Sequence, residues 1–467
     1  MPPPHVVVIG GGLAGLAASI ALADHGIHVS LLEKNPRLGG RATSYRLPTG
    51  EYIDNCQHVT LRCCTNLEDF YRRIGVADRI HYYDRLVFSD SKRRRAGIKP
   101  SRLPAPFHLA PSFAAFPLLT IKDKWSIARA MLRILRSGGS PSLPGGMTML
   151  EWLRRAKQTP AAIDRFWRVV LVSALNEDLD RTDAHYGILV FWKAFLSNPA
   201  AFGIGVPAVP LAELYASCSE RIERKAGQVR TRCTAGEVYV SNGDATGVRL
   251  EDGSEVAADY FVVAVPFDRL LKLAPPEIRS TEAFANLANL CASPITGVHM
   301  WFDRPVMLEP FLTSVDQTIQ WVFNKAALGA ADGEQIGQYL QIVISASHGL
   351  SDRSQQEIID ICRRELCDLF PAAEEAVLVR AVVIREGAAT FSPALGCDRW
   401  RPSQKTPIRN LFLAGDWTQT GWPATMESAV RSGYQAAEAI LLAEGSRVRL
   451  VQPELPPNGV ARWFARA

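Results

Sequence analysis

The N-terminal part of the chain has the hydrophobic pattern of a strand, a glycine-rich turn, a helix and a second strand. Residues 6–9 are continuously apolar and β-branched, which is typical of a strand buried on both faces of a parallel sheet. Glycines dominate residues 10–15, small apolar residues predict a helix over 16–25, and residues 28–32 return to a strand pattern. This order predicts a βαβ unit.

The pattern changes further along the chain. Residues 86–215 have a helical pattern that is rich in Trp and Phe. Residues 228–263 then predict a meander of short strands, of which the last is a buried apolar run. Near the C-terminus, residues 411–414 predict a last buried strand and residues 423–443 predict a long helix.

The composition indicates a soluble globular protein. Of the 467 residues, 47% are apolar and 21% are charged, and the formal net charge is +5. The basic residues do not form a stripe of the kind that binds nucleic acid. Their densest cluster, Lys92–Arg95, predicts either a solvated loop or a contact with anionic lipid headgroups.

The cysteines and histidines do not predict a metal site. Nine cysteines are scattered without the spacing of a zinc site or a redox C-x-x-C pair, and the nine histidines are equally dispersed. This usage favours reduced thiols in a cytoplasmic protein. We find no signal-peptide pattern and no uninterrupted apolar run of about 18 residues, so we expect no membrane-spanning segment.

The first turn matches the dinucleotide-binding pattern G-x-G-x-x-G at Gly10, Gly12 and Gly15. The first glycine permits the tight turn, the second lets the backbone approach a pyrophosphate, and the third allows close packing of the helix on the sheet. The helix that follows offers free N–H groups and the positive end of its dipole to phosphates. Glu33 ends the second strand, where its carboxylate can accept hydrogen bonds from ribose hydroxyls.

Two further motifs distinguish FAD from NAD. Gly39–Arg41 combines glycines that let the backbone pass a cofactor with an arginine that can neutralise pyrophosphate charge. Asp416 follows the last strand and can accept a hydrogen bond from a ribityl hydroxyl. The helix after Pro423 is expected to direct the positive end of its dipole at the flavin, which would stabilise an anionic reduced flavin by about 0.5–2 kcal/mol. We therefore predict FAD as the cofactor. The predicted contacts are Gly10, Gly12, Leu13, Ala14, Gly15, Glu33, Lys34, Gly40, Arg41, Val238, Gly415, Asp416, Ala424, Thr425 and Met426.

These motifs predict an α/β fold with a Rossmann-like, two-dinucleotide-binding-domain FAD domain that is discontinuous in the sequence. We assign residues 1–85, 216–275 and 396–445 to this domain. Residues 86–215 and 276–395 are expected to form an α+β substrate domain with a helical cap, and residues 446–467 a C-terminal tail.

Four longer stretches carry a family pattern. They are Asp54–His58 (D-N-C-Q-H), Arg165–Trp167 with Ala174–Asn176, Val206–Pro207 with Pro210–Tyr215, and Ala414–Val430. These stretches resemble the amine-oxidase and phytoene-desaturase superfamily of flavoproteins and, within it, the hydroxysqualene dehydroxylase family. Cys56 stands where that family usually has glycine, so its backbone either avoids positive φ or is strained there.

The resemblance implies reductive removal of the hydroxyl group of hydroxysqualene to give squalene, with reduced FAD as the hydride source. Loss of water from an allylic alcohol gives a delocalised cation, and a dry apolar cavity would protect that cation from water. A long isoprenoid substrate also requires an apolar tunnel. Its candidate lining, for which ordinary core packing is the alternative, is Phe166, Trp167, Phe191, Trp192, Phe195 and Phe202.

The candidate catalytic residues lie in the D-N-C-Q-H stretch, which the resemblance places beside the flavin. His58 is the candidate proton donor, because the pKa of histidine suits general acid chemistry; a core histidine satisfied by backbone is the alternative. Gln57 is expected to bind the flavin or the substrate hydroxyl. Asp54 is expected to orient His58 or to cap the local turn. Asn176 and Glu177 are expected either to end a helix or to face the cavity.

Two alternative functions remain open. A carotenoid or phytoene-type desaturase, or an amine oxidase, of the same fold would move hydride from the substrate to the flavin. A non-enzymatic prenyl-lipid carrier is disfavoured by the intact glycines and Glu33. Because no second G-x-G-x-x-G is present, we expect the flavin to be reduced by a separate electron donor or by loosely bound nicotinamide. We also expect an isoprenoid lipid substrate, no nucleic acid partner, and a peripheral contact with the inner face of the cell membrane.

Overall fold

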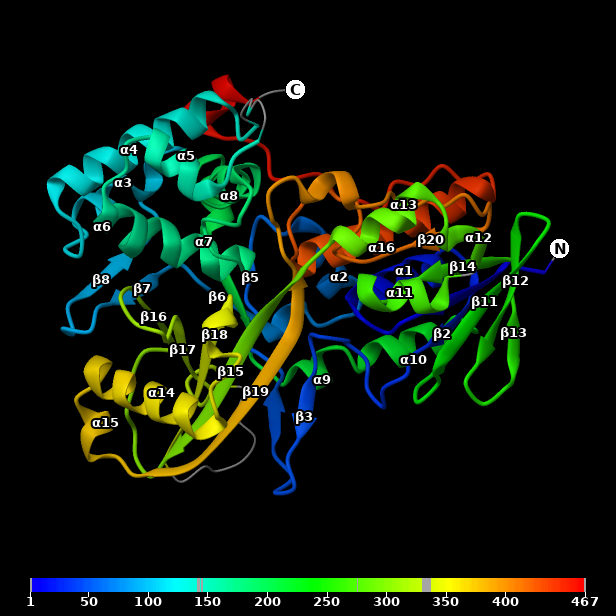
Figure 1. Cartoon of the computed structure of the whole chain (residues 1–467), viewed down its shortest axis with the longest axis horizontal. Coiled ribbons are helices and arrows are strands. Elements are labelled where there is room, and N and C mark those ends of the chain that lie inside the picture. The colour runs from blue at the N-terminus through cyan, green and yellow to red at the C-terminus, as the bar shows by residue number, and fades with distance from the viewer. Residues whose placement is uncertain (1, 141–142, 144–145, 275, 330–336, 466–467) are drawn as a thin grey trace.

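The computed structural model describes residues 2–140, 143, 146–274, 276–329 and 337–465. A parallel five-stranded sheet forms the core of one half of the molecule (Figure 1). All four neighbouring strand pairs are parallel, which suits a sheet covered on both faces. Its strands, in spatial order, are β10 (Gln228–Arg230), β2 (His28–Leu32), β1 (His5–Ile9), β14 (Tyr260–Val263) and β20 (Leu411–Leu413).

Two helices of the cofactor half pack closely together. Helix α1 (Leu13–Asp24) is made almost entirely of small or aliphatic residues, and all but its last residue are buried. Helix α16 (Met426–Ala443) lies beside it, and a Cβ atom at Gly433 would lie only 2.2 Å from the carbonyl oxygen of Ala14. Glycine at this position therefore allows the two helices to approach within backbone contact.

A seven-stranded sheet forms the core of the other half. Its strands β15 (Ala292–Phe302) and β19 (Leu378–Phe391) are long and antiparallel, and they extend toward the cofactor half in Figure 1. Helix α14 (Gln355–Leu369) buries its apolar face against this sheet. The other strands are β18 (Gln338–Ser345), β17 (Trp321–Asn324), β16 (Phe311–Ser314), β7 (Leu86–Ser89) and β8 (Arg95–Ile98).

Helices cap the seven-stranded sheet on the side of the C-terminus (Figure 1). The ranges, with two π-helical segments marked η3 and η4, are α3 (Ala110–Ala114), α4 (Ile121–Arg136), α5 (Met149–Arg155), α6 (Pro160–Ala162), η3 (Ile163–Trp167), α7 (Arg168–Leu175), α8 (Ala184–Phe191) and η4 (Trp192–Leu196).

Smaller elements complete the fold. The antiparallel sheet β11–β13 spans Ala235–Ser241, Asp244–Leu250 and Glu255–Ala257. The remaining ranges are β3 (Ser44–Arg46), β4 (Tyr52–Asp54), β5 (Thr60–Leu61), α2 (Thr65–Arg73), β6 (Ile80–Tyr83), β9 (Ile204–Pro207), α9 (Leu211–Leu214), α10 (Ser217–Arg224), α11 (Phe267–Leu273), α12 (Pro276–Arg279), α13 (Glu282–Ala285) and α15 (Ala372–Glu375).

The predicted α/β class and the βαβ unit are confirmed, and the three segments assigned to the cofactor domain supply all five strands of the parallel sheet. The predicted meander is corrected at its start. Residues Gln228–Arg230 leave the antiparallel ribbon and pair with β2, so they extend the parallel sheet instead. In the part of the chain that the structure describes, no helix is long and apolar enough to cross a bilayer.

Candidate FAD and substrate site

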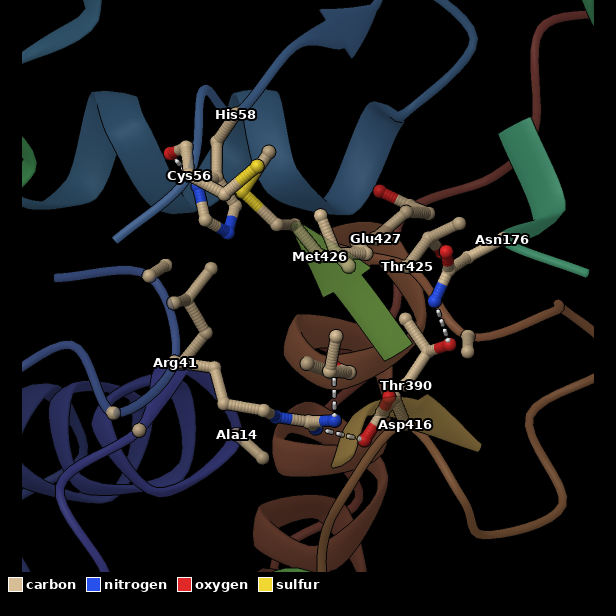
Figure 2. Close-up of a pocket in the computed structure, with 18 of the residues that line it drawn as sticks. Ala14, Arg41, Cys56, His58, Asn176, Thr390, Asp416, Thr425, Met426 and Glu427 are labelled. Carbon is tan, nitrogen blue, oxygen red and sulfur yellow. Dashed lines mark hydrogen bonds and ion pairs between the residues drawn. The ribbon is translucent and has the colours of Figure 1, made fainter. Parts of the chain in front are cut away.

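A cavity of about 990 Å³ lies where the two halves of the molecule meet. Glycines and charged residues that follow β1 and β2, together with residues at the start of α16, surround one end. Apolar residues from β7, α7, α8 and the seven-stranded sheet surround the other end. Figure 2 shows Arg41 and Asp416 joined on one side of this cavity, with His58 and Met426 across it.

The glycines of the first turn bring two backbone segments into contact at the polar end. A Cβ atom at Gly40 would lie 2.9 Å from the Cα atom of Gly12, and a Cβ atom at Gly15 would lie 1.9 Å from the carbonyl oxygen of Gly10. Gly12 is the N-cap of α1 and has no side chain to accept hydrogen bonds from the first turn. The N–H groups and the dipole of this helix are therefore free to receive phosphate groups.

Two backbone amides hold the carboxylate of Glu33 in place. Its Oε2 atom accepts a hydrogen bond from the Gly11 amide at 2.7 Å, and its Oε1 atom accepts one from the Asn35 amide at 2.7 Å. Each carboxylate oxygen keeps further lone pairs. The side chain of Glu33 is only 4% exposed and lines the cavity. It can therefore still accept hydrogen bonds from the ribose hydroxyls expected there.

At the other side of the polar end, Arg41 and Asp416 form an ion pair. The Arg41 Nη2 atom lies 2.6 Å from Asp416 Oδ1, and Arg41 Nη1 donates to the carbonyl oxygen of Ala389 at 2.7 Å. This pair connects two predicted cofactor contacts that are 375 positions apart in the sequence. Both side chains line the cavity, where they would bind the pyrophosphate and the ribityl chain of FAD.

Arg401 holds the loop that carries Asp416. Its guanidinium group is buried and donates to the carbonyl oxygen of Asp416 at 3.0 Å and to the hydroxyl of Thr420 at 3.2 Å. Asp398 neutralises its charge at 2.9 Å. A buried arginine that binds several carbonyl groups fixes the path of the backbone around the flavin end of the site.

His58 presents a hydrogen-bond acceptor to the cavity. Its Nδ1 atom lies 2.9 Å from the carbonyl oxygen of Cys56, which can only accept, so Nδ1 carries the proton. Burial lowers the pKa of His58 below its usual value, against the opposing effect of the Cys56 carbonyl. The neutral ring therefore has a free Nε2 lone pair, and His58 is suited to accept a proton rather than to donate one at neutral pH.

Asp54, Gln57 and Lys325 form a buried polar cluster behind His58. Lys325 Nζ lies 2.9 Å from Asp54 Oδ2 and donates to Gln57 Oε1 at 2.8 Å, and the side chains of Asp54 and Lys325 are each 3% exposed. Burial alone would raise the pKa of Asp54. The charge of Lys325 and the hydrogen bonds from Leu211 and Ser44 outweigh burial and hold this pKa below its usual value.

Most predicted site residues line the cavity. They are Gly10, Gly12, Leu13, Ala14, Glu33, Lys34, Gly40, Arg41, Gln57, His58, Gly415, Asp416, Ala424, Thr425 and Met426.

Three predicted site residues do not line the cavity. Gly15 serves the packing of α1 against the turn at Gly10. Asp54 is directed away from the cavity, toward Lys325. Val238 is buried within β11, and the strand contributes Ala235 and Gly236, together with the preceding Cys233 and Thr234, in its place.

The predicted aromatic lining is correct in part. Phe195 and Phe202 line the cavity, whereas Phe166, Trp167 and Phe191 pack against one another in the core, with ring centroids 4.5–5.7 Å apart. Trp192 lines a smaller neighbouring cavity. The lining also includes aliphatic and aromatic residues that the sequence did not single out: Leu86, Phe88, Val169, Val170, Leu189, Val190, Ile204, Ile295, Trp321, Phe323 and Val343.

Asn176 and Glu177 have structural roles. Asn176 ends helix α7 in the left-handed conformation, and its side chain binds the backbone of Ser293 and the hydroxyl of Thr390, although it also borders the cavity. Glu177 is fully buried and accepts hydrogen bonds from Ser392 and from the Asp178 amide. Cys56 is not among the described non-glycine residues with positive φ, so replacement of the family glycine causes no strain there.

Sequence reasoning missed Lys325, Arg401 and Cys233. A lysine that directly follows the buried strand Trp321–Asn324 is a signal for a buried partner, because lysine is rarely fully buried unless paired. The sequence offered no comparable signal for Arg401, whose six partners are Tyr186, Asp398 and four residues of the segment 416–420.

Comparisons with known proteins agree with this geometry. A sequence profile described as flavin containing amine oxidoreductase matches residues 13–441. The chain is 27% identical over 455 residues to a 15-cis-phytoene desaturase from an Oncidium hybrid cultivar, covering 94% of this chain and 78% of that protein. It is 26% identical over 479 residues to a zeta-carotene desaturase from Solanum lycopersicum, covering 94% and 81% of the two chains.

Solved structures show the same fold. A putrescine oxidase triple mutant has a TM-score of 0.74 at 16% sequence identity, covering 94% of this chain and 99% of that chain. An oxidoreductase from Methanosarcina mazei has a TM-score of 0.72 at 18% identity, covering 94% and 100%. The predicted FAD cofactor is confirmed, and the protein is an FAD-dependent oxidoreductase. The chain belongs to the family of flavin-containing amine oxidoreductases.

Proposed function

We propose that this protein transfers hydride between FAD and a long polyisoprenoid lipid. The observation that carries the proposal is the composition of the cavity, which runs from a nucleotide-binding end lined by glycines to an end lined by aliphatic and aromatic side chains. The extent of this apolar lining favours a hydrocarbon substrate, because its apolar surface is removed from water there.

Desaturation is the reaction that the curated relatives favour, since they are named phytoene and zeta-carotene desaturases. FAD, when bound, takes up the hydride in this reaction. The protein must then accept the proton that leaves the neighbouring carbon atom. His58 provides this acceptor at Nε2, and the Cys56 carbonyl stabilises the proton already present at Nδ1.

Reductive dehydroxylation of hydroxysqualene to squalene is the second candidate. The Asp54–His58 and Ala414–Val430 stretches favour it, because they resemble the hydroxysqualene dehydroxylase family. His58 would then have to be protonated before catalysis in order to donate to the departing hydroxyl group. A separate electron donor that reduces FAD between turnovers is part of this second candidate.

Two anaerobic incubations with the purified protein distinguish the candidates. In the first, oxidised enzyme is mixed with phytoene in detergent, and desaturation is expected to extend the conjugated system and shift its absorbance to longer wavelength. In the second, reduced enzyme is mixed with hydroxysqualene, and squalene is measured by mass spectrometry. Failure of both reactions in a protein that retains FAD would reject the polyisoprenoid proposal.

The pH dependence of the reaction tests the role of His58. For desaturation, kcat/KM is expected to rise with pH through the lowered pKa of His58 and to be constant at neutral pH. For dehydroxylation, kcat/KM is expected to fall with rising pH over the same range. In both cases His58→Gln should retain FAD, lose this pH dependence and slow the reaction by about 10²–10⁴-fold.

A further inference from the structure

Exposed apolar side chains gather at one corner of the molecule, on helix α4, on the segment before α3 and on the C-terminal 3₁₀ helix η9 (Gly459–Phe464). Figure 1 shows α3, α4 and the C-terminal segment at the same corner, and α4 and η9 lie side by side. The exposed fractions are 46% for Leu103, 50% for Phe107, 74% for Ile121, 68% for Trp125, 42% for Leu132 and 80% for Trp463. We call these six residues the docking face.

The apolar residues of helix α4 form a narrow stripe. Ile121, Trp125, Ala128 and Leu132 are exposed, and at about 100° per residue they fall within an arc of about 60°. The opposite side of the helix is occupied by Ile127, Ile134 and other buried residues that face the protein core. Helix α4 is therefore apolar on two sides, and only one of them is covered by the protein.

The charges that flank this stripe have one sign. Lys122, Arg129, Arg133 and Arg136 are exposed and have no ion-pair partner in the described part of the chain. The sole acidic residue of α4, Asp123, is buried in the capping box with Thr120. An exposed helix with an apolar stripe beside free basic groups has the chemistry of a helix that lies in the headgroup region of a membrane.

The basic run Lys92–Arg95, which the sequence analysis considered as a lipid contact, is mostly paired with acidic residues of the protein. Arg93 pairs with Glu374 at 2.5 Å, Arg94 with Asp90 at 2.6 Å, and Arg95 with Glu309. Three of its four cations are therefore neutralised by the protein's own carboxylates. Helix α4, whose cations are unpaired among the described residues, is therefore the better candidate for a lipid contact.

The C-terminal segment is fixed to this corner. The Val460 amide donates to the carbonyl oxygen of Ala105 at 3.0 Å, and Ala461 is fully buried. Trp463 nevertheless remains 80% exposed. A tryptophan that is held by an ordered segment but points outward is suited to the boundary between headgroups and hydrocarbon.

The corner also adjoins a smaller cavity that borders the substrate site. This second cavity, of about 210 Å³, is lined by Gly138, just after α4, and by residues of the C-terminal segment. It shares Cys63, Lys193 and Trp422 with the main cavity. A membrane bound at the docking face would lie close to this smaller cavity.

We propose that the docking face binds the surface of an anionic phospholipid bilayer, with the side chains of Trp125, Ile121 and Trp463 inserted between headgroups and the basic residues of α4 paired with lipid phosphates. The exposed apolar residues supply the insertion energy, and the unpaired cations supply the preference for negative charge. The proposal does not depend on which reaction the cavity performs, because it concerns binding without substrate.

The experiment is co-sedimentation of the full-length, FAD-loaded protein with vesicles of phosphatidylcholine, with and without phosphatidylglycerol. We expect binding that increases with phosphatidylglycerol and weakens with salt. The double variant Ile121→Ser, Trp125→Ser should lower the partition coefficient by about tenfold or more, because two large apolar side chains are lost from the contact. The triple variant Lys122→Gln, Arg129→Gln, Arg133→Gln should lose the dependence on phosphatidylglycerol.

Matched variants test whether position matters. Leu308→Ser removes an apolar side chain that is 88% exposed but lies outside the docking face, and it should bind vesicles like the wild type. Arg93→Gln, Arg95→Gln should also bind like the wild type, because these arginines are already paired. Retained flavin absorbance shows that each variant is folded.

Three results would overturn the proposal. The first is a wild-type protein that does not bind vesicles containing phosphatidylglycerol at low salt. The second is equal binding by the wild type and the Ile121→Ser, Trp125→Ser variant. The third is a dimer, seen by sedimentation velocity, that this variant dissociates, because the face would then be covered by a second copy of the chain.

Discussion

The two ends of the central cavity are built in different ways. At the nucleotide end, the glycines at 10, 15 and 40 permit approaches between backbone segments that a side chain would not allow. At the apolar end, side chains from β7, α7, α8, β17 and β18 form the surface, and each contributes only part of it. One end is specified by individual atoms and the other by total volume and polarity.

This difference predicts different responses to mutation. A single added methyl group can prevent binding at the nucleotide end, whereas the apolar end should tolerate one substitution at a time and change its selectivity instead. The loop of Asp54–His58 lies between the two ends, and a buried ion pair holds it to the seven-stranded sheet through Lys325. The largest effect is expected at this junction.

Replacement of Lys325 by Met should cost about 3–5 kcal/mol of stability, because it leaves the Asp54 carboxylate buried and unpaired. The measurement is urea unfolding of the FAD-loaded protein at neutral pH. The double variant Lys325→Met, Asp54→Asn should recover part of this loss, since no uncompensated charge remains. A single Lys325→Met variant as stable as the wild type would show that the pair does not hold the loop.

The same variant has an expected pH dependence. Because the pKa of Asp54 is lowered in the folded protein, its contribution to stability is complete above the unfolded pKa and is lost as the pH falls through the folded pKa. In Lys325→Met the remaining burial should raise this pKa. The difference in stability between wild type and variant should therefore narrow as the pH is lowered toward about 4.

Gly15→Ala should have the next largest effect. Its new Cβ atom would lie 1.9 Å from the carbonyl oxygen of Gly10, so α1 must shift away from the turn that receives the phosphates. We expect a loss of about 1–3 kcal/mol in stability and protein that is purified largely without flavin absorbance. Gly387→Ala is the matched control, because no atom lies within 4 Å of a Cβ atom there, and it should retain FAD.

The nucleotide end could be predicted from the sequence because short motifs carry it. The glycine turn and the Gly415–Met426 region each place several cavity-lining residues within a short stretch of sequence, so the spacing of the motifs located them. Val238 does not line the cavity, because no motif marks which residue of a short strand borders it. Lys325 could not be assigned, since its partners Asp54 and Gln57 come from a distant segment that only the folded chain brings near. Arg401 lies near most of its partners in the sequence, but no motif marks an arginine that binds backbone carbonyl groups.

The apolar end was much less predictable. Of six proposed aromatic residues, Phe195 and Phe202 line the cavity, because aromatic side chains in a helical cap fill cores and cavities alike. Strand β19 was also not predicted, since its apolar first half, Leu378–Ile384, is followed by a more polar half, and most of its residues are only partly buried. Its 14 residues are defined by pairing with β15 rather than by their own pattern.

The smallest expected effect separates cavity lining from core packing within the cap. Phe191 is fully buried among other rings, so Phe191→Leu should cost about 1 kcal/mol in stability and leave substrate selectivity unchanged. Phe202 borders the cavity, so Phe202→Leu should cost less than about 1 kcal/mol but enlarge the apolar end. Thermal unfolding and competition between polyisoprenoids of different length measure the two effects. Equal selectivity in both variants would mean that Phe202 does not contact the substrate, and that the volume of the apolar end is determined elsewhere in its lining.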